Sequence, residues 1–271
     1  MPELPEVETT RRGLAPHLLG QRITAVEIRD HRLRWPVPLG LPGVLAGQTV
    51  RAVDRRAKYL LLRCDAGTLM VHLGMSGSLR LVNAAARPGK HEHWDIVLAD
   101  GGVLRYRDPR RFGSLHWIVG EAADHPLLRE LGPEPLSSDF TGERLYALSR
   151  RRRVPVKVFL MDSRVVVGVG NIYASEALYR AGIRPDRPAG RVALRRYDRL
   201  ADAVRAVLQD ALACGGTTLR DFVGGEGRPG YFKQDLQVYG RAGQQCRNCG
   251  NIVLMCRLGQ RASYFCGTCQ R

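Results

Sequence analysis

The first six residues of the chain carry the clearest candidate for covalent chemistry. Pro2 follows an initiator methionine, which is commonly removed before a small residue, so that Pro2 would carry the free α-amino group. The pKa of such an amine is near ~8, which leaves a useful fraction unprotonated at neutral pH. An unprotonated amine attacks carbonyl-like carbons, and Glu3 and Glu6 add carboxylates that can move protons. The same residues also fit an ordinary polar start to a helix, so the segment alone leaves both interpretations open.

Four cysteines near the end of the chain have the spacing of a structural zinc site. Two Cys-x-x-Cys pairs are separated by 16 residues, a pattern typical of zinc binding. Four thiolates can surround one Zn²⁺ and stabilise a β-hairpin too small to fold alone. We therefore expect one structural Zn²⁺ on Cys246, Cys249, Cys266 and Cys269.

The overall charge favours a polyanionic partner. The chain has 271 residues, of which 42 are Lys or Arg and 26 are Asp or Glu, for a formal net charge of +16. Such a balance is typical of proteins that bind nucleic acid or an acidic membrane face. The apolar runs are too short to span a bilayer, and no secretory signal pattern opens the chain. We therefore expect a soluble, intracellular protein.

Hydrophobic patterning predicts which elements carry the N-terminal residues. A helix is expected over 5–19, with Gly20 as its stop. From residue 22 to about 119 the pattern changes to short strands separated by turns, which favours an antiparallel sandwich or barrel. The β-rich segments are 23–28, 49–62, 69–73, 78–82, 94–98 and 103–106.

The second half of the chain reads as helical. A helical region is expected to begin at 126–131 and to be broken by the prolines that follow, where we place a domain boundary. Further helices are expected over 172–181 and about 192–213. The glycine-rich segment 214–235 is interpreted as a mobile lid. The run Arg150-Arg151-Arg152-Arg153 fits either a solvated helix end or a phosphate contact.

Several motifs in one order give the chain a resemblance to the formamidopyrimidine-DNA glycosylase family. The resemblance runs from end to end and is completed by the four-cysteine segment. The motifs are Pro2-Glu3-Leu4-Pro5-Glu6-Val7-Glu8, Arg55-Arg56-Ala57-Lys58-Tyr59-Leu60, His72-Leu73-Gly74-Met75-Ser76-Gly77, Asp108-Pro109-Arg110-Arg111-Phe112-Gly113, Val167-Gly168-Val169-Gly170-Asn171-Ile172-Tyr173-Ala174-Ser175-Glu176 and Pro229-Gly230-Tyr231-Phe232.

The resemblance implies an α+β multidomain fold and a base-excision repair enzyme. Its parts would be an N-terminal antiparallel β-sandwich over 1–132, a helix-two-turn-helix domain over 133–235 and a C-terminal zinc-finger hairpin over 236–271. The implied partner is double-stranded DNA with an oxidised purine or an abasic site. A monomer would remove 8-oxoguanine opposite cytosine, or formamidopyrimidines, and then cut the strand by β,δ-elimination.

The resemblance also assigns roles to single residues. Pro2 would attack C1′ of a flipped nucleotide, with Glu3 as acid/base at the sugar and Glu6 as a helper near the base. Lys58 would assist base loss and β-elimination, and Arg261 would serve δ-elimination and clamp a phosphate. Met75, Arg110 and Phe112 resemble residues that fill the gap in the duplex, with Arg110 facing the orphaned cytosine. Further DNA contacts would come from His72, His91, Arg153 and Asn171.

Two alternatives compete with this interpretation. The related endonuclease VIII shares the fold and the N-terminal proline but prefers oxidised pyrimidines; it typically has glycine where this chain has Leu4, and it lacks the Met75 and Arg110-Arg111-Phe112 arrangement. A non-enzymatic zinc-finger DNA-binding protein would need the basic charge and the finger, but not a free Pro2 beside Glu3 and Lys58.

Overall fold

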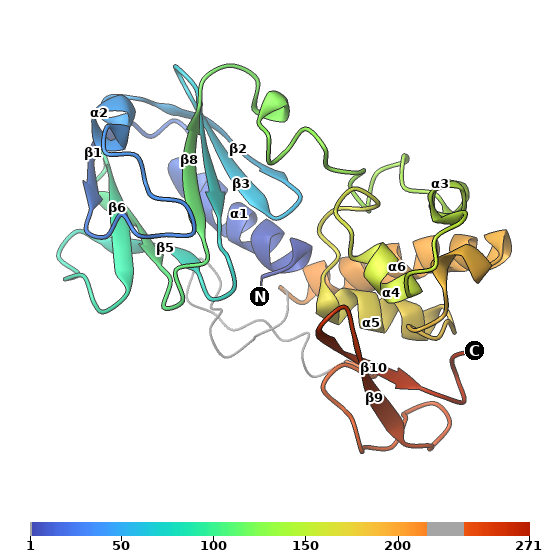
Figure 1. The fold of residues 1–271 in the computed structure, drawn as a ribbon. Helices are drawn as coiled ribbons and strands as arrows, with labels where there is room; N and C mark the ends of the chain where they lie inside the picture. Colours follow the sequence, from blue (N-terminus) through green and yellow to red (C-terminus); the bar gives the residue numbers. More distant parts are fainter. Residues whose placement is uncertain (1, 216–235) are drawn as a thin grey trace. The chain divides into compact units, whose positions relative to one another are not determined.

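The computed structural model describes residues 2–215 and 236–271, so most of the segment interpreted as a lid lies outside the described residues. The chain divides into two compact units (Figure 1). The first contains residues 2–129, and the second contains residues 130–213 together with 236–271. The predicted domain boundaries after residues 132 and 235 stay predictions. None of the helices in the described ranges is long and apolar enough to cross a membrane.

The first unit begins with helix α1 (Leu4–Leu18), which confirms the helix expected over 5–19. Pro5 lies in its first turn, where a missing N–H costs nothing. Pro16 lies inside the last turn and does not end the helix, which continues to Leu18. The stop comes at Gly20, whose φ of +79° is a conformation that glycine adopts without strain.

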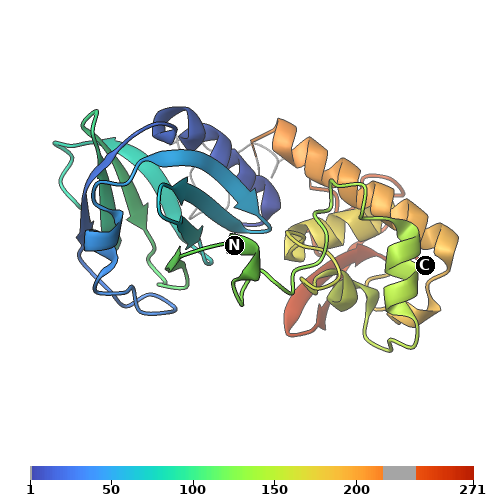
Figure 2. The same cartoon turned by 90° about the horizontal axis from the view of Figure 1, so that it is seen from above.

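Two four-stranded antiparallel sheets form the sandwich of the first unit. The strands of this unit can be followed in Figure 2. The orders of the two sheets are β1-β6-β7-β5 and β2-β3-β4-β8, so the barrel alternative is excluded and the predicted sandwich is confirmed. Helix α1 packs against strands from both sheets, and the short helix α2 (Leu41–Leu45) packs against β1. The strands are β1 (Ile23–Ile28), β2 (Val50–Arg56), β3 (Tyr59–Cys64), β4 (Thr68–His72), β5 (Ser78–Asn83), β6 (Glu92–Leu98), β7 (Gly102–Arg107) and β8 (Ser114–Ile118).

The β-rich segment expected over 49–62 proves to be a hairpin. Strands β2 and β3 pair in antiparallel register, with Arg56 opposite Tyr59. The two residues between them form the turn, and Ala57 adopts a φ of +54° there. The chain therefore reverses at Ala57 and Lys58, which places Lys58 at the tip of a hairpin rather than within a strand.

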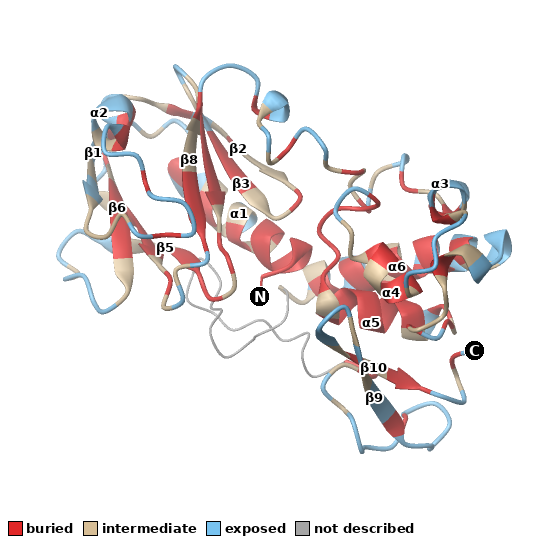
Figure 3. Ribbon diagram, in the orientation of Figure 1, coloured by how far each residue is buried: buried red, intermediate tan, exposed pale blue. Residues whose placement is uncertain are grey.

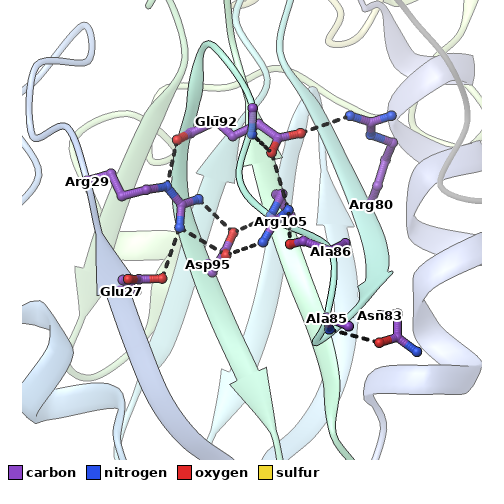
Figure 4. Close-up of polar contacts among 10 residues, drawn as sticks. Glu27, Arg29, Arg80, Asn83, Ala85, Ala86, Glu92, Asp95 and Arg105 are labelled. Carbon is purple, nitrogen blue, oxygen red and sulfur yellow. Dashed lines mark hydrogen bonds and ion pairs between the residues drawn. The ribbon is translucent and has the colours of Figure 1, made fainter.

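A charged cluster lies on the sheet formed by β1, β6, β7 and β5. Figure 4 shows Asp95 between the guanidinium groups of Arg29 and Arg105. Asp95 and Arg105 are both buried. Burial raises the pKa of Asp95, but the hydrogen bonds from the two arginines outweigh it and lower that pKa below its usual value. Breaking such a buried pair from one side is strongly destabilising, so this cluster ties β1, β6 and β7 together.

The second unit is built around helix α6 (Leu194–Ala213), whose buried face is visible in Figure 3. Helices α5 (Asn171–Arg180) and α6 confirm the helices expected over 172–181 and 192–213. Helices α3 (Gly142–Ser149) and α4 (Val156–Leu160) were not predicted. A short 3₁₀ turn occupies Ala189–Arg191 in this unit, and another occupies Ala122–Asp124 near the end of the first unit.

The helical region expected at 126–131 is wrong. Consecutive turns occupy this stretch instead. The Nδ1 atom of His125 accepts the backbone N–H of Leu127, and the His125 carbonyl accepts those of Leu128 and Arg129. Gly132 and Pro133 follow after one turn, so there is no room for a helix to propagate.

A two-stranded hairpin, β9 (Val253–Leu258) and β10 (Arg261–Cys266), completes the second unit. Gly259 and Gln260 join the strands, and both have positive φ, the pattern of a tight hairpin turn. Strand β10 packs against α5. The predicted fold class is confirmed in all three parts: sandwich, helical domain and C-terminal hairpin.

Candidate functional site

The start of α1 holds Pro2, Glu3 and Glu6 in buried positions. Glu3 is the N-cap residue, and its extended backbone turns the chain into the helix. The Glu6 carboxylate accepts the backbone N–H of Glu3 at 2.8 Å, which is half of a capping box. Pro2 directly precedes this cap, so the first helical turn fixes its place.

A chain of ion pairs and hydrogen bonds links α1 to the Lys58 turn. Glu8 pairs with Arg11, Arg12 and Arg55. Burial raises the pKa of Glu8, but hydrogen bonds and charge from these arginines outweigh it and lower the pKa to about 2. Arg55 also donates to the carbonyl of Ala57 at 2.8 Å. The position of the Lys58 turn is therefore coupled to the first helix.

His72 ends β4 directly opposite Tyr59, the residue after Lys58. The two rings are 4.8 Å apart. Burial, together with the charges of Lys58 and Arg34, lowers the pKa of His72 to about 4. Nδ1 accepts the backbone N–H of Gly74, which leaves Nε2 to carry the proton of the neutral ring. His72 therefore presents a neutral N–H donor, which suits a phosphate oxygen.

The predicted gap-filling residues lie on two loops in direct backbone contact. Met75 follows β4, whereas Arg110 and Phe112 lie between β7 and β8. Gly74 has a φ of +67°, and a Cβ added there would lie 2.4 Å from the Phe112 backbone. Arg110 is exposed, Phe112 is 42% exposed, and the guanidinium carbon lies 4.8 Å from the Phe112 ring centre. The structure thus brings Met75, Arg110 and Phe112 together.

His91 lies just before β6, at the edge of the same region. Its backbone has a φ of +70°, and its carbonyl accepts the N–H of Asp108 at 3.0 Å. Partial burial and the charges of Lys90 and Arg107 lower the pKa of His91. A half-exposed imidazole at this point can make one hydrogen bond to a ligand.

Asn171 begins α5 in the second unit, and buried Lys157 holds its amide. Lys157 Nζ donates to Asn171 Oδ1 at 2.6 Å, to the Ala262 carbonyl at 3.1 Å and to Ser263 Oγ at 2.8 Å. Asn171 Nδ2 donates to the same Ala262 carbonyl at 3.1 Å. Helix α4, the start of α5 and the hairpin strand β10 therefore meet at one ammonium group.

Arg261 stands at the start of β10 and is exposed. It lines a hollow of about 380 Å³ together with Arg152 and Asp162, and the other lining residues are apolar ones in and beside α4 and at the tip of the hairpin. Arg153 is exposed beside it but does not line this hollow. Arg150 has a different role from its three successors, because it stacks on Tyr146 and donates to the Val192 carbonyl.

Glu176 anchors the C-terminal hairpin to α5. Its buried carboxylate accepts the backbone N–H groups of Gln237, Val238 and Tyr239 at 2.8–3.0 Å. Farther along the same helix, the Tyr179 hydroxyl lies 3.2 Å from Cys246 Sγ.

The four predicted metal-ligating cysteines converge. Their sulfur atoms all lie within 4.8 Å of one another, as a single metal ion requires. Burial raises the pKa of Cys246, but hydrogen bonds from Tyr179 and from the backbone of Cys249 and Asn248 lower it to about 6. Asn248 lowers the pKa of Cys269, but burial and the neighbouring thiols outweigh it and raise the pKa to about 12. Thiols this close lose all four protons only if a cation balances their charge, so the donor set fits a metal ion.

The combination of sandwich, helical domain and four-cysteine hairpin defines the helix-two-turn-helix class of DNA-binding folds. The sequence profile of the formamidopyrimidine-DNA glycosylase N-terminal domain matches residues 1–115, and that of the formamidopyrimidine-DNA glycosylase H2TH domain matches residues 131–223. The chain belongs to the formamidopyrimidine-DNA glycosylase family.

Relatives match over the whole length of this chain. The formamidopyrimidine-DNA glycosylases of Alkalilimnicola ehrlichii and Stutzerimonas stutzeri are 63% and 62% identical, with 100% of each chain covered. A solved complex of the Lactococcus lactis enzyme with DNA containing an abasic site has a TM-score of 0.92 at 33% identity, with 99% of each chain covered. The Thermus thermophilus MutM (FPG) protein has a TM-score of 0.88 at 40% identity, covering 99% of this chain and 98% of that one.

Several residues that shape the site were given no role by sequence reasoning. Three of them, Glu8, Asp108 and Glu176, lie inside the motifs that carry the resemblance. The motifs mark these positions but do not indicate their hydrogen-bond partners. Lys157 lies in an apolar stretch and gave no signal, because its three partners come from elements 14 to 106 residues away.

Proposed function

We propose that this chain is a DNA glycosylase of base-excision repair that removes oxidised purines and then cuts the abasic strand. Membership of the family supports the glycosylase activity. The observation that carries the residue-level proposal is the buried start of α1, where Pro2 precedes a cap closed by Glu3 and Glu6. A secondary amine with two adjacent carboxylates is the arrangement that imine chemistry needs.

Pro2 is the proposed nucleophile. After the damaged nucleotide rotates out of the stack, the Pro2 nitrogen forms a bond to C1′ while the bond from C1′ to the base breaks. The base leaves with that electron pair and takes up a proton, and the sugar ring opens to an iminium ion. The iminium acidifies the C2′ hydrogens, so that β-elimination and then δ-elimination release the two phosphates.

The neighbouring residues divide the proton transfers and the binding. Glu3 acts at the sugar as acid/base, Glu6 supports departure of the base, and Lys58 assists base loss and β-elimination. The coupling of the Lys58 turn to α1 through Glu8 and Arg55 supports a joint role. Arg261 serves δ-elimination and holds a phosphate, and His72, His91, Arg153 and Asn171 supply further DNA contacts.

The two loops that carry Met75, Arg110 and Phe112 are proposed to fill the gap that the flipped nucleotide leaves in the duplex. Flipping leaves a gap, and unstacking costs on the order of a few kcal/mol. Apolar side chains commonly fill such gaps. Arg110, exposed beside Phe112, can donate to the acceptor edge of the orphaned cytosine, whereas the amino group of adenine would oppose a second donor.

The four-cysteine cluster is proposed to hold one Zn²⁺ with a structural role. Four thiolates form a closed site without an open position for substrate. The metal would fix the hairpin that presents Arg261. Since the substrate is DNA, we also propose a cytoplasmic location at the bacterial nucleoid.

The test compares Glu3→Gln with wild type on two substrates. Glu3 is needed mainly while the base departs, so the variant should lose 8-oxoguanine excision by about 10²–10⁴-fold. A pre-formed abasic site has already lost its base, so much of that cutting should remain. Glu121→Gln, an exposed carboxylate in the same unit, is the matched control and should behave as wild type. Equal losses on both substrates would assign Glu3 to the shared imine steps and refute this division of roles.

A further inference from the structure

A buried carboxylate joins the two loops that carry the gap-filling residues. Asp108 is fully buried. One oxygen accepts Ser76 Oγ at 2.7 Å and the backbone N–H of Arg110 at 3.2 Å. The other accepts the backbone N–H of Gly113 at 2.9 Å and the Tyr106 hydroxyl at 3.1 Å. Four donors from two loops and one strand therefore converge on a single side chain.

Glycines allow the same two loops to pack backbone against backbone. A Cβ added to Gly74 would lie 2.4 Å from backbone atoms of Phe112 and Gly113. At Gly113 it would overlap the Tyr106 hydroxyl and lie 2.7 Å from the His72 carbonyl oxygen. Real Cβ atoms do not approach other atoms this closely, so each position excludes every larger residue. The loops are held both by contact and by the Asp108 hydrogen bonds.

Three of the four donors to Asp108 lie at or beside a gap-filling residue. Ser76 follows Met75, the N–H of Arg110 itself donates, and Gly113 follows Phe112. The side chains of Arg110 and Phe112 remain exposed, so Asp108 constrains their backbone without contacting DNA.

We propose that Asp108 and Ser76 are positioning residues that preset the Met75, Arg110 and Phe112 wedge before it enters the duplex. If the loops became ordered only on insertion, the entropy lost would reduce the binding free energy gained by filling the gap. Loops that are already ordered avoid this loss. The pair acts through the wedge and has no part in the chemistry at C1′. This inference rests on the proposed function, since it assigns the wedge to the orphaned position of damaged DNA.

The test uses Asp108→Asn and Ser76→Ala, with Ser114→Ala as the matched control. In Asp108→Asn, the NH₂ group of the amide faces groups that are themselves hydrogen-bond donors, so some of the four hydrogen bonds to position 108 are lost. Ser76→Ala removes only the hydrogen bond from Ser76 Oγ. Ser114 is an equally buried serine on β8, and its hydroxyl has no hydrogen-bond partner among the described residues. Thermal unfolding of all three variants measures the purely structural effect.

Two readouts separate positioning from stability and from chemistry. The first is the fluorescence of 2-aminopurine placed beside the orphaned base, opposite a non-cleavable abasic analogue, which reports insertion without catalysis. The second is the ratio of cutting rates for an abasic site in duplex DNA and in single-stranded DNA, where no gap forms. Asp108→Asn should lower both the insertion signal and this ratio, the ratio by about tenfold or more, because small misplacements of binding groups cost up to roughly 10²-fold.

Ser76→Ala should show the same changes with smaller size, and it decides the test if Asp108→Asn does not fold. Ser114→Ala should match wild type in both readouts. An unaltered insertion signal and an unaltered ratio in Ser76→Ala would overturn the proposed positioning role. If the wild-type protein gives the insertion signal but cuts neither substrate, the proposed function is refuted. The insertion signals of the variants still test the positioning role in that case.

Discussion

The Glu6 carboxylate accepts the backbone N–H of Glu3 at 2.8 Å, so one side chain both caps α1 and lies beside the proposed nucleophile. Substitution can separate these two roles, because a glutamine amide oxygen can also close a capping box. Glu6→Gln should therefore keep the melting temperature while lowering 8-oxoguanine excision. Glu6→Ala should lose about 1 kcal/mol of stability as well. Thermal unfolding and single-turnover excision measure the two effects; full activity in Glu6→Gln would limit Glu6 to capping.

Glu8 gives a prediction about pH. Its pKa is lowered to about 2 by three arginines, although burial opposes this. A depressed carboxylate pKa stabilises the folded state above the unfolded pKa of about 4.5, and this stability is lost as the pH falls toward about 2. Glu8→Gln should therefore lower the free energy of unfolding at pH 7 by on the order of 2 kcal/mol.

The difference between wild type and Glu8→Gln should shrink steadily between pH 4.5 and 2. Chemical denaturation across that range measures it. Glu130→Gln is the control, because its ion pair with Arg164 is exposed and contributes little. A difference that stays constant with pH would show that the three arginines do not set the charge of Glu8.

His72 and Arg261 should differ in how salt affects their contributions to DNA binding. His72 has a pKa of about 4 and is neutral at pH 7, whereas Arg261 is charged. Removing a charge from a phosphate contact flattens the plot of log K against log salt by roughly one unit. Arg261→Ala should show this flattening, and His72→Ala should weaken binding with the slope unchanged. Titrations at several salt concentrations test both; a flatter slope for His72→Ala would mean that it binds DNA as a cation.

The cysteine cluster predicts one zinc per chain. Cys249→Ser should lose the metal, since a hydroxyl replaces one of four thiolate ligands. Cys256→Ser is a close control, because Cys256 lies on the same hairpin, opposite Ser263, and outside the cluster. Metal analysis should find zinc in the control and not in Cys249→Ser, which should also bind DNA poorly. Zinc retained in Cys249→Ser would contradict the ligand set.

Local patterns predicted much of the fold. The apolar period of α6 and the β-rich composition of β1 gave elements close to those observed. The cysteine spacing likewise predicted a cluster that the fold brings together. These features depend on residues near one another in sequence or on a fixed motif. Helix α3 was not predicted, although its cap is local in sequence: Thr141, a residue type typical of helix starts, accepts the Arg144 N–H.

The missing parts depend on partners that are distant in sequence. Asp108 was visible within a motif, but its hydrogen bond to Ser76 joins residues 32 apart. Lys157 binds Ser263 across 106 residues, and its apolar neighbours gave no reason to expect a buried ammonium. The turns in place of the helix expected at 126–131 are an exception, because the hydrogen bond involved is local: His125 Nδ1 accepts the backbone N–H of Leu127.

The most direct test of the central proposal is the mass of the protein before and after borohydride reduction with DNA containing 8-oxoguanine. Loss of Met1 and one covalent adduct on the peptide that begins with Pro2 are the predicted results. A variant that retains an extra N-terminal residue should form no adduct, because an amide nitrogen is not nucleophilic. Pro5→Ala, which alters a proline in the same helix but keeps the free amine, should still form it. An adduct on Lys58 or another lysine, with the Pro2 peptide unmodified, would contradict the assignment of Pro2 as nucleophile.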